Sequence, residues 1–155
     1  MKEITIFSYG DSNKLSTWSN VPYLFTKTLE NKGLVVNRVN ILPNRYINLL
    51  FNYSISPLLR LIDRKSSFDY SRSFLYIREA KFKIEKAVNR YPNSDAFVFL
   101  NFDFSVSEFT SKPSFQFGDW TYEHYLNYFV SKSPNFFEKE FLKHQQTEIN
   151  NSNIV

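Results

Sequence analysis

The alternation of apolar and polar positions in the first 42 residues predicts a strand, a loop, a helix and a second strand. The run EITIFS at residues 3–8 is short and apolar on both sides, as expected of a strand buried on both faces. A polar, turn-rich stretch follows at 9–19, and residues 34–42 (LVVNRVNIL) alternate again. Because this order favours a right-handed crossover, we expect a parallel sheet with the 9–19 loop at its carboxyl edge, where open α/β sheets bind ligands.

The first predicted helix has end signals at both of its termini. Ser19 or Asn20 can cap its N-terminus, Pro22 lies in its first turn, and Gly33 follows its last turn. Its expected apolar face consists of Val21, Leu24, Phe25, Thr28 and Leu29.

Two longer helices are predicted in the middle of the chain. Residues 43–63 carry an apolar face, and we expect Pro57 to break or kink the helix there. The face consists of Tyr46, Leu49, Leu50 and Tyr53. Residues 70–91 show the cleanest helical spacing, with apolar positions every three or four residues from Phe74 to Tyr91. The opposite face of that helix is basic, and it carries Arg72, Arg78, Lys83, Lys86 and Arg90.

The last third of the chain predicts two strands and two helices. The apolar run AFVFL at 96–100 is typical of a central parallel strand, and PSFQFG at 113–118 predicts a further strand. A short helix is expected over 121–130. A longer one is expected over 135–149, where Asn135 and Glu138 have the spacing of a capping box. We expect a last strand to begin at Ile154.

Composition removes several classes of function. The sequence has no Cys and only two His, which excludes disulfides, thiolate nucleophiles and Cys-ligated metals and argues against a multi-His metal site. No apolar run approaches the length of a membrane helix, and the N-terminus lacks the features of a signal peptide, so we expect a cytoplasmic protein. The 17 Phe and 10 Tyr suggest platforms for sugars or bases, but the codon usage of an AT-rich genome explains them better.

Charge is distributed unevenly along the chain. Residues 60–90 carry nine basic and four acidic side chains, whereas residues 91–155 carry four basic and eight acidic ones. A basic segment can attract phosphates, nucleic acid or the anionic inner face of a membrane, although it is more often a solvated helix face. No motif supports nucleic acid, so we predict no nucleic-acid partner and keep peripheral membrane contact through residues 60–90 as an expectation.

One loop and three single residues outside the apolar patterns are considered as candidates for binding or catalysis. The loop GDSNKLSTWS at 10–19 precedes a helix N-terminus, a place that suits a phosphate or a sugar hydroxyl, although an ordinary turn explains it equally well. Asp119 follows a predicted strand and is a candidate base, or else the cap of the next helix. His124 is a candidate proton carrier. Asp103, also at a predicted sheet edge, is interpreted as a turn residue.

Three segments together resemble the N-terminal domain of bacterial glycosyltransferases of the GT-B fold, retaining family 4. The first is the opening strand, the loop with S-T-W-S at 16–19 and Pro22, although Asn20 replaces the Gly of the family. The second is PSFQFGDWT at 113–121, similar to P-[IV]-x-x-[YW]-[TS]-D-x-T, with Gly118 in place of Ser or Thr. The third is the helix over 135–149 with the strand after it. Residues 43–92 match only as helices.

The resemblance implies a single Rossmann-like, three-layer α/β domain over residues 1–155 with a mostly parallel sheet, one half of a GT-B fold. In the family this half holds a glycan or lipid-linked acceptor, and a C-terminal domain holds the nucleotide-sugar donor through a basic pair and an E-x7-E motif. No counterpart of that C-terminal domain is found in this sequence, so the chain is expected to be inactive alone. No cofactor is implied. The match places Gly10, Asp11, Ser16, Thr17 and Trp18 at the cleft and Asp119 at its floor, whereas His124 has no secure counterpart.

A second hypothesis comes from the length and from the incomplete catalytic set. Both are equally typical of a stand-alone, flavodoxin-like module that binds a ligand or a protein without catalysis. The sequence alone leaves the two hypotheses open.

Overall fold

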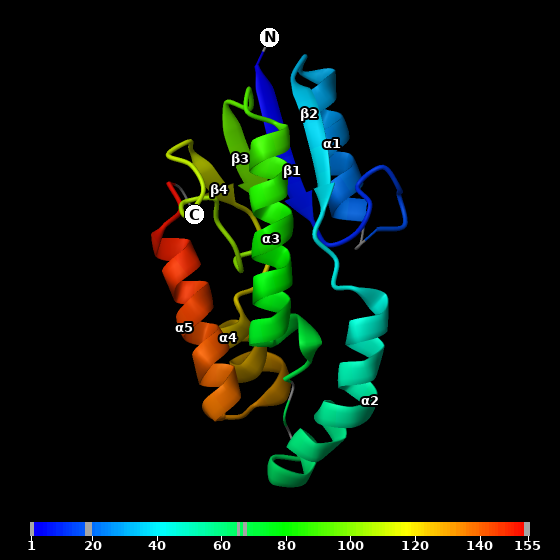
Figure 1. The fold of residues 1–155 in the computed structure, drawn as a ribbon, viewed down its shortest axis with the longest axis vertical. Helices are drawn as coiled ribbons and strands as arrows, with labels where there is room; N and C mark the ends of the chain where they lie inside the picture. The colour runs from blue at the N-terminus through cyan, green and yellow to red at the C-terminus, as the bar shows by residue number, and fades with distance from the viewer. Residues whose placement is uncertain (1, 18–19, 65, 67, 154–155) are drawn as a thin grey trace.

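The chain folds around a four-stranded parallel sheet (Figure 1). A computed structural model describes residues 2–17, 20–64, 66 and 68–153. The strands are β1 (Glu3–Ser8), β2 (Val35–Asn40), β3 (Ala96–Phe99) and β4 (Ser114–Gln116), in the order β2-β1-β3-β4, and every neighbouring pair is parallel. The four strands predicted between residues 3 and 118 are therefore confirmed, each within two residues of its expected bounds at either end.

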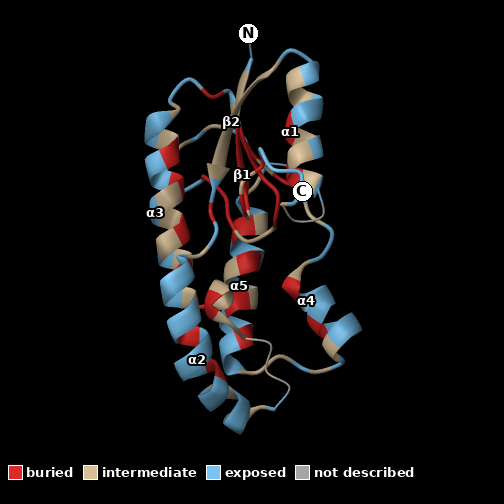
Figure 2. Cartoon of the chain, turned by 90° about the vertical axis from the view of Figure 1, so that its right-hand side faces the viewer, coloured by how far each residue is buried: buried red, intermediate tan, exposed pale blue. Residues whose placement is uncertain are grey.

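Helices cover both faces of the sheet, so the protein is a three-layer, Rossmann-like α/β domain as predicted. The helices are α1 (Val21–Asn31), α2 (Arg45–Ile62), α3 (Phe74–Arg90), α4 (Tyr122–Tyr125) and α5 (Phe136–Asn150). A 3₁₀ turn η2 (Tyr70–Arg72) precedes α3, and a π-helical turn η3 (Leu126–Val130) extends α4. Helix α1 lies on one face of the sheet and α3 on the other (Figure 2). No helix among the described residues is long and apolar enough to cross a membrane.

The core consists of two apolar clusters, one on each face of the sheet. On the α3 side, Phe7 of β1 stacks on Phe99 of β3 with ring centroids 4.4 Å apart, and both pack against Ile84. On the α1 side, Ile6 packs with Leu100 beneath α1. Strands β1 and β3 are thus buried on both faces, which confirms the interpretation of their sequences. Full burial of one such side chain contributes about 1.5–3 kcal/mol, so these central strands anchor the fold.

Helix α2 differs from its prediction in two ways. The first difference is that it continues unbroken through Pro57. Its N-terminus is capped by Asn44, which accepts hydrogen bonds from the backbone N–H groups of Tyr46 and Ile47. The second difference is the face that it buries. The predicted apolar face, Tyr46, Leu49, Leu50 and Tyr53, is exposed; Phe51 is the large side chain that α2 buries. Periodicity identifies an apolar stripe but not the surface that covers it, and the face of the sheet is already covered by α3.

The expected face of α3 is confirmed except at its first turn. Ala80, Ile84 and Ala87 are buried as expected, but Tyr76 is buried there and Phe74 is exposed.

The expected face of α1 is confirmed only in part. Phe25 and Leu29 pack against the core, whereas Leu24 is 55% exposed. Pro22 and Thr26 are the buried residues of this helix.

The caps of the helices confirm some of the end signals and correct others. Asn20 stands at the N-cap of α1 with a positive φ, but its side chain caps nothing, and Ser19 lies outside the described residues. Thr121 caps α4, so the interpretation of Asp119 as the cap is wrong. The capping box of α5 is confirmed: Asn135 accepts from the N–H of Glu138 at 3.0 Å, and the Glu138 carboxylate accepts from the N–H of Asn135 at 2.9 Å.

The sheet reverses its winding between β1 and β3, because β2 lies on one side of β1 and β3 on the other. Open α/β sheets bind ligands beyond the carboxyl ends of strands at such a point. Below that edge, α2, α4, α5 and the first turns of α3 extend away from the sheet (Figure 1). The strand predicted to begin at Ile154 lies outside the described residues.

Candidate functional site

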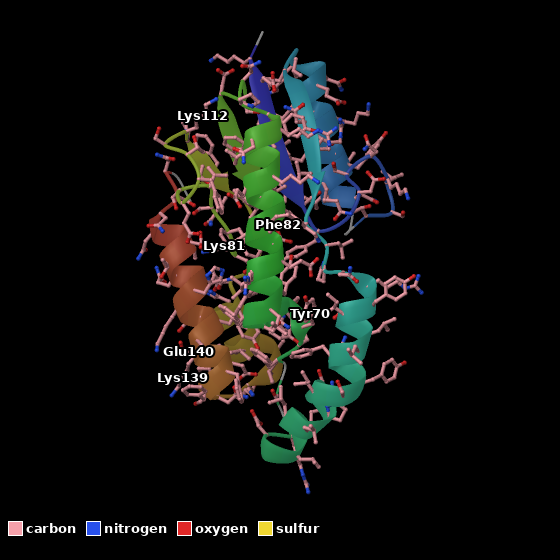
Figure 3. The ribbon with its side chains drawn as sticks, viewed as in Figure 1. Tyr70, Lys81, Phe82, Lys112, Lys139 and Glu140 are labelled. Carbon is pink, nitrogen blue, oxygen red and sulfur yellow. The ribbon has the colours of Figure 1, made fainter. Side chains whose placement is uncertain are left out.

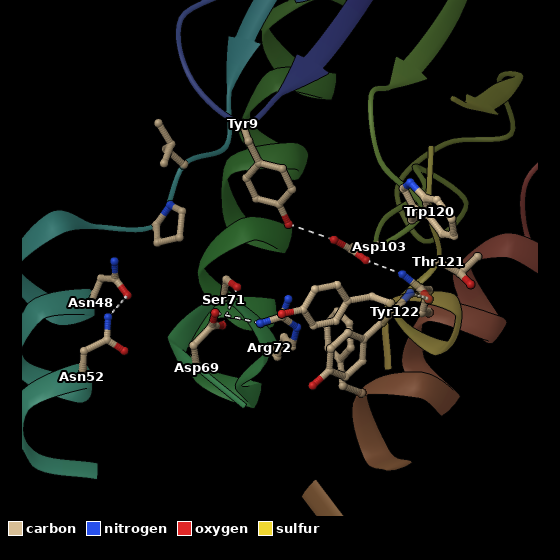
Figure 4. Close-up of a pocket in the computed structure, with 15 residues that line it drawn as sticks. Tyr9, Asn48, Asn52, Asp69, Ser71, Arg72, Asp103, Trp120, Thr121 and Tyr122 are labelled. Carbon is tan, nitrogen blue, oxygen red and sulfur yellow. Dashed lines mark hydrogen bonds and ion pairs between the residues drawn. The ribbon is translucent and has the colours of Figure 1, made fainter. Parts of the chain in front are cut away.

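Two adjoining cavities open at the carboxyl edge of the sheet, with volumes of about 600 and 360 Å³. Figure 4 shows the residues that line the larger one. Tyr9, Asp103 and Trp120 line both of them. Each of these residues follows a different strand: Tyr9 follows β1, Asp103 follows β3, and Trp120 follows β4. The cavities therefore lie where the reversed winding of the sheet places a binding crevice.

Asp103 is the centre of the polar wall. Its carboxylate accepts one hydrogen bond from the Tyr9 hydroxyl at 2.9 Å and one from the side-chain amide of Gln145, on α5, at 2.7 Å. Its backbone N–H donates to the Asn101 side chain at 3.0 Å, which fixes the turn after β3. Burial raises the pKa of Asp103 above its ordinary value, against the opposing effect of the two hydrogen bonds. Burial, together with the nearby carboxylate, also raises the pKa of Tyr9, so Tyr9 acts as a donor at neutral pH.

A second buried carboxylate holds the segment that carries Asp103. Glu148, on α5, accepts from the backbone N–H of Ser105 at 3.0 Å and from its hydroxyl at 2.6 Å. Lys81 of α3 lies 3.3 Å from the same carboxylate (Figure 3). His144 lies one turn away, 3.6 Å from Glu148, and burial lowers its pKa. This network ties α3, α5 and the turn after β3 into one support behind the cavities.

The opposite wall of the larger cavity is built from the η2 turn and α4. The Arg72 guanidinium pairs with Asp69 at 2.7 Å and lies over the ring of Tyr122, 4.3 Å from its centroid. The N–H of Tyr122 donates to the Gln145 side chain at 2.9 Å, so Gln145 bridges this wall to Asp103. The charge of Arg72 is therefore already engaged by a carboxylate and by a ring.

Helix α2 closes the third side with amide groups. Asn48 and Asn52 line the larger cavity and are joined to each other by a hydrogen bond of 3.1 Å. They lie one helical turn apart, so both project from the same face of α2. Leu42 and Pro43 lead from β2 into this wall.

Aromatic rings form the rim. Trp120 is half exposed and packs edge-on against Phe129, with ring centroids 5.3 Å apart, and against Tyr128 at 5.6 Å. Tyr122 and Tyr125 stack at 6.1 Å beside it. The cavities thus combine broad apolar rings with a few convergent amide, hydroxyl and carboxyl groups, which is the usual make-up of a small-molecule site.

Comparison with known proteins does not identify a function for these cavities. No family model, curated protein or solved structure matches the chain. A functional assignment therefore depends on the site itself and on the resemblance in sequence. Among the described residues, no cluster of three or more His, Asp or Glu is placed to hold a metal ion.

The residues predicted to form the site are only partly brought together. Asp119 lines the smaller cavity, next to Gly118 and Trp120. Gly10, Asp11, Ser16 and Thr17 line neither cavity, and Trp18 lies outside the described residues.

The loop at residues 10–17 has a structural role, because its residues contact one another. Gly10 has φ +103°, and a Cβ there would lie 2.6 Å from the side chain of Thr17. Thr17 donates to the backbone oxygen of Asp11 at 2.6 Å, and Asp11 accepts from Asn13. The hydrogen bonds from Asn13 lower the pKa of Asp11. These contacts shape the turn after β1, which positions Tyr9.

His124 stands outside both cavities. It is exposed, its Nδ1 lies 2.8 Å from the Thr121 hydroxyl, and its ring packs beside Trp120 and Tyr128. It thus belongs to the aromatic rim and supports the position of Trp120.

Sequence reasoning missed most of the polar wall. Tyr9 directly follows β1, and Asp103 lies in the turn after β3. These positions at the ends of two central strands are a signal that could have ranked both, but from the sequence Asp103 is interpreted as a turn residue. Gln145 and Arg72 carry no such signal, because only the packing of α5 and η2 against the sheet edge brings them to the cavity.

Proposed function

We propose that this domain is the acceptor-side half of a retaining glycosyltransferase, and that its cavities bind a saccharide acceptor. The observation that supports this most is the composition of the cavity walls at the carboxyl edge. Five aromatic side chains lie beside three side-chain amides and a partly buried carboxyl group. The aromatic ones are Tyr9, Trp120, Tyr122, Tyr125 and Phe141, and the polar ones are Asn48, Asn52, Gln145 and Asp103.

Such walls suit a polyhydroxylated ring. A sugar has apolar C–H faces that lie against aromatic rings, and a rim of hydroxyls that both donate and accept hydrogen bonds. Asn and Gln side chains offer both functions, and an ionised carboxylate accepts from one or two hydroxyls. A volume of about 600 Å³ falls within the range of small-molecule sites.

The charge of the walls argues against a diphosphate as the main ligand of this half. Among the described lining residues, Arg72 is the only cation, and Asp69 already pairs with it. Phosphate sites normally offer several positive groups or a helix N-terminus. This agrees with the resemblance, which assigns the nucleotide-sugar donor to a separate C-terminal domain.

Asp103 is the residue we assign to orient the attacking acceptor hydroxyl. Tyr9 and Gln145 hold its two oxygens, and a raised pKa makes a carboxylate a better proton acceptor. A hydroxyl that donates to it gains electron density on oxygen, which favours attack on a donor sugar. We keep Asp119, at the smaller cavity, as a second carboxylate that contacts the sugars.

A titration with saccharides tests this proposal. Trp120 lines both cavities, so its fluorescence should change when oligosaccharides bind. Asp103→Asn should weaken binding about tenfold to a hundredfold, because a hydrogen bond to a charged group contributes about 1.5–3 kcal/mol. Asp95→Asn is the matched control, since Asp95 lies at the amino end of β3 and accepts from the N–H of Glu3.

Three results separate the hypotheses. Saccharide binding that is lost in Asp103→Asn but kept in Asp95→Asn supports the proposal. Binding of a flavin without any saccharide binding supports the stand-alone module. The coding sequence around these 155 codons gives an independent test, because the proposal expects a second Rossmann-like domain with a basic pair and E-x7-E.

A further inference from the structure

Helix α2 presents an apolar stripe to solvent. Its members recur at intervals of four, three, four and four residues, so they form one line along the helix: Tyr46, Leu50, Tyr53, Pro57 and Leu61. Tyr46, Tyr53 and Leu61 are more than 80% exposed, and Leu50 is 70% exposed. Helix α2 also lies at the margin of the fold, away from the sheet (Figure 1). Soluble domains rarely leave a continuous line of this kind uncovered.

The charged side chains within α2 are all positive. Residues 45–62 contain no Asp or Glu, and Arg45, Arg60 and Arg64 are exposed at or beside its two ends. The acidic residue that follows the helix, Asp63, lies 2.6 Å from Lys132 and is engaged inside the fold.

Part of the basic segment 60–90, by contrast, is turned inward. Arg72 pairs with Asp69, Lys81 with Glu148, and Lys83 with Glu79. Arg78 of α3 also lies one turn from exposed Phe74 and Phe82. However, α3 contains Glu79 and Glu85, whereas α2 contains no acidic residue. Contact between this protein and an anionic surface is therefore better placed on α2 than along α3.

We infer that α2 docks on an anionic membrane, lying in the interface with its stripe among the acyl chains and its arginines at the headgroups. Interfacial helices combine an apolar face with flanking Lys or Arg, and tyrosine is enriched at the depth where headgroups meet acyl chains. Anionic lipids add an attraction for each arginine.

A lipid surface suits this stripe better than a second copy of the chain does. A symmetric pair of α2 helices would place the same exposed arginines of both copies around one interface. Like charges at that distance repel, and α2 carries no acidic residue to offset them. An anionic bilayer covers the apolar stripe with acyl chains and offers negatively charged headgroups to the arginines.

The opposite face of α2 connects docking to the cavity. Asn48 and Asn52 line the larger cavity, while Leu50 and Tyr53 lie on the far side of the same two turns. A helix is about 10 Å across, so docking brings the cavity within that distance of the headgroups. Delivery of a lipid-linked acceptor to the cavity rests on the proposed function; the docking itself does not.

Vesicle co-sedimentation tests the docking. The probes are phosphatidylcholine vesicles with and without phosphatidylglycerol, at low and high salt. We expect binding to the anionic vesicles that salt weakens. Leu50→Gln combined with Leu61→Gln should lower binding at least about tenfold, because both side chains lose their apolar burial. Arg60→Gln should lower it about fivefold.

The control is a matched apolar pair on α3. Leu75 and Phe82 are 54% and 67% exposed, and Phe82 is labelled in Figure 3. Leu75→Gln with Phe82→Gln should change binding by less than about twofold. Circular dichroism confirms that each variant is folded, which the exposure of all four positions favours.

Three outcomes would overturn the docking. One is equal binding to neutral and anionic vesicles, and another is binding that the stripe variants leave intact. The third is a dimer in light scattering that the stripe variants dissociate, which would make a second copy the occupant. Because no saccharide is present, these results are independent of the titration that tests the cavity.

Discussion

Removal of the Glu148 carboxylate tests whether the support behind Asp103 is a buried charge network. Glu148 is almost fully buried on α5 and receives two hydrogen bonds from Ser105, at 3.0 and 2.6 Å. Lys81, on α3, lies 3.3 Å away. Glu148→Ala deletes the acceptor for all three groups while leaving them in place.

The expected decrease in the free energy of unfolding follows from the hydrogen bonds that the remaining groups lose. A hydrogen bond to a charged acceptor contributes about 1.5–3 kcal/mol, and the N–H and hydroxyl of Ser105 each lose one. Lys81 keeps Glu108 as a partner, so it is not left unpaired. We expect Glu148→Ala to lower the free energy of unfolding by about 3–5 kcal/mol, the usual cost of breaking a buried pair. Glu148→Gln keeps one acceptor oxygen and should cost about half as much.

Urea unfolding followed by circular dichroism measures this loss. Glu140→Ala is the control, because Glu140 lies exposed on the same helix and pairs only with Lys143 among the described residues (Figure 3). It should change stability by less than about 0.5 kcal/mol. A loss below about 1 kcal/mol for Glu148→Ala would refute the reasoning, since it would mean that the N–H and hydroxyl of Ser105 find other partners at no cost.

Three further predictions concern other parts of the fold. Burial lowers the pKa of His144, so the unfolded chain binds the proton of this imidazole more tightly than the folded protein does. The free energy of unfolding should therefore decrease as pH falls below about 6.5. His144→Gln should abolish that pH dependence in urea titrations. Gly10→Ala should destabilise by about 1–3 kcal/mol, and Thr17→Ser, which removes the clashing methyl, should recover part of this loss in thermal melts. The ion pair with Arg38 lowers the pKa of Glu30 to about 2, so the stability it contributes should disappear as pH falls from about 4.5 toward 2, and Glu30→Gln should lack that loss in acid titrations.

The order and type of the strands could be predicted because the sheet imposes simple patterns. A strand that is buried on both faces is apolar at consecutive positions, and residues 96–100 meet that condition. Capping boxes are equally local, which is why Asn135 and Glu138 were found. The buried faces of the helices are not local. Helix α2 turns Tyr46 and Tyr53 outward because α3 already covers the sheet, and no pattern within α2 records that.

The residues of the candidate site also fall into those that local sequence predicts and those that only the packed fold brings together. Positions directly after β1, β3 and β4 could be predicted from the rule for parallel sheets, and Asp119 was found in this way. Asp103 satisfies the same rule, but only its hydrogen bonds with Tyr9 and Gln145 distinguish it from a turn residue. Those partners come from residues 9 and 145, far apart in sequence, so their convergence is a property of the packed fold.

The amino-acid usage of α2 is best explained if both of its faces are functional. A helix that only covered a core would place its large apolar residues inward, yet α2 buries Phe51 and exposes Leu50, Tyr53 and Leu61. Its inward side instead contributes Asn48 to the larger cavity. Polar residues toward a cavity and apolar residues toward solvent are the reverse of the usual pattern, and they leave on α2 an apolar surface that a ligand could remove from water. A saccharide inside and a lipid surface outside would satisfy both faces of the same helix.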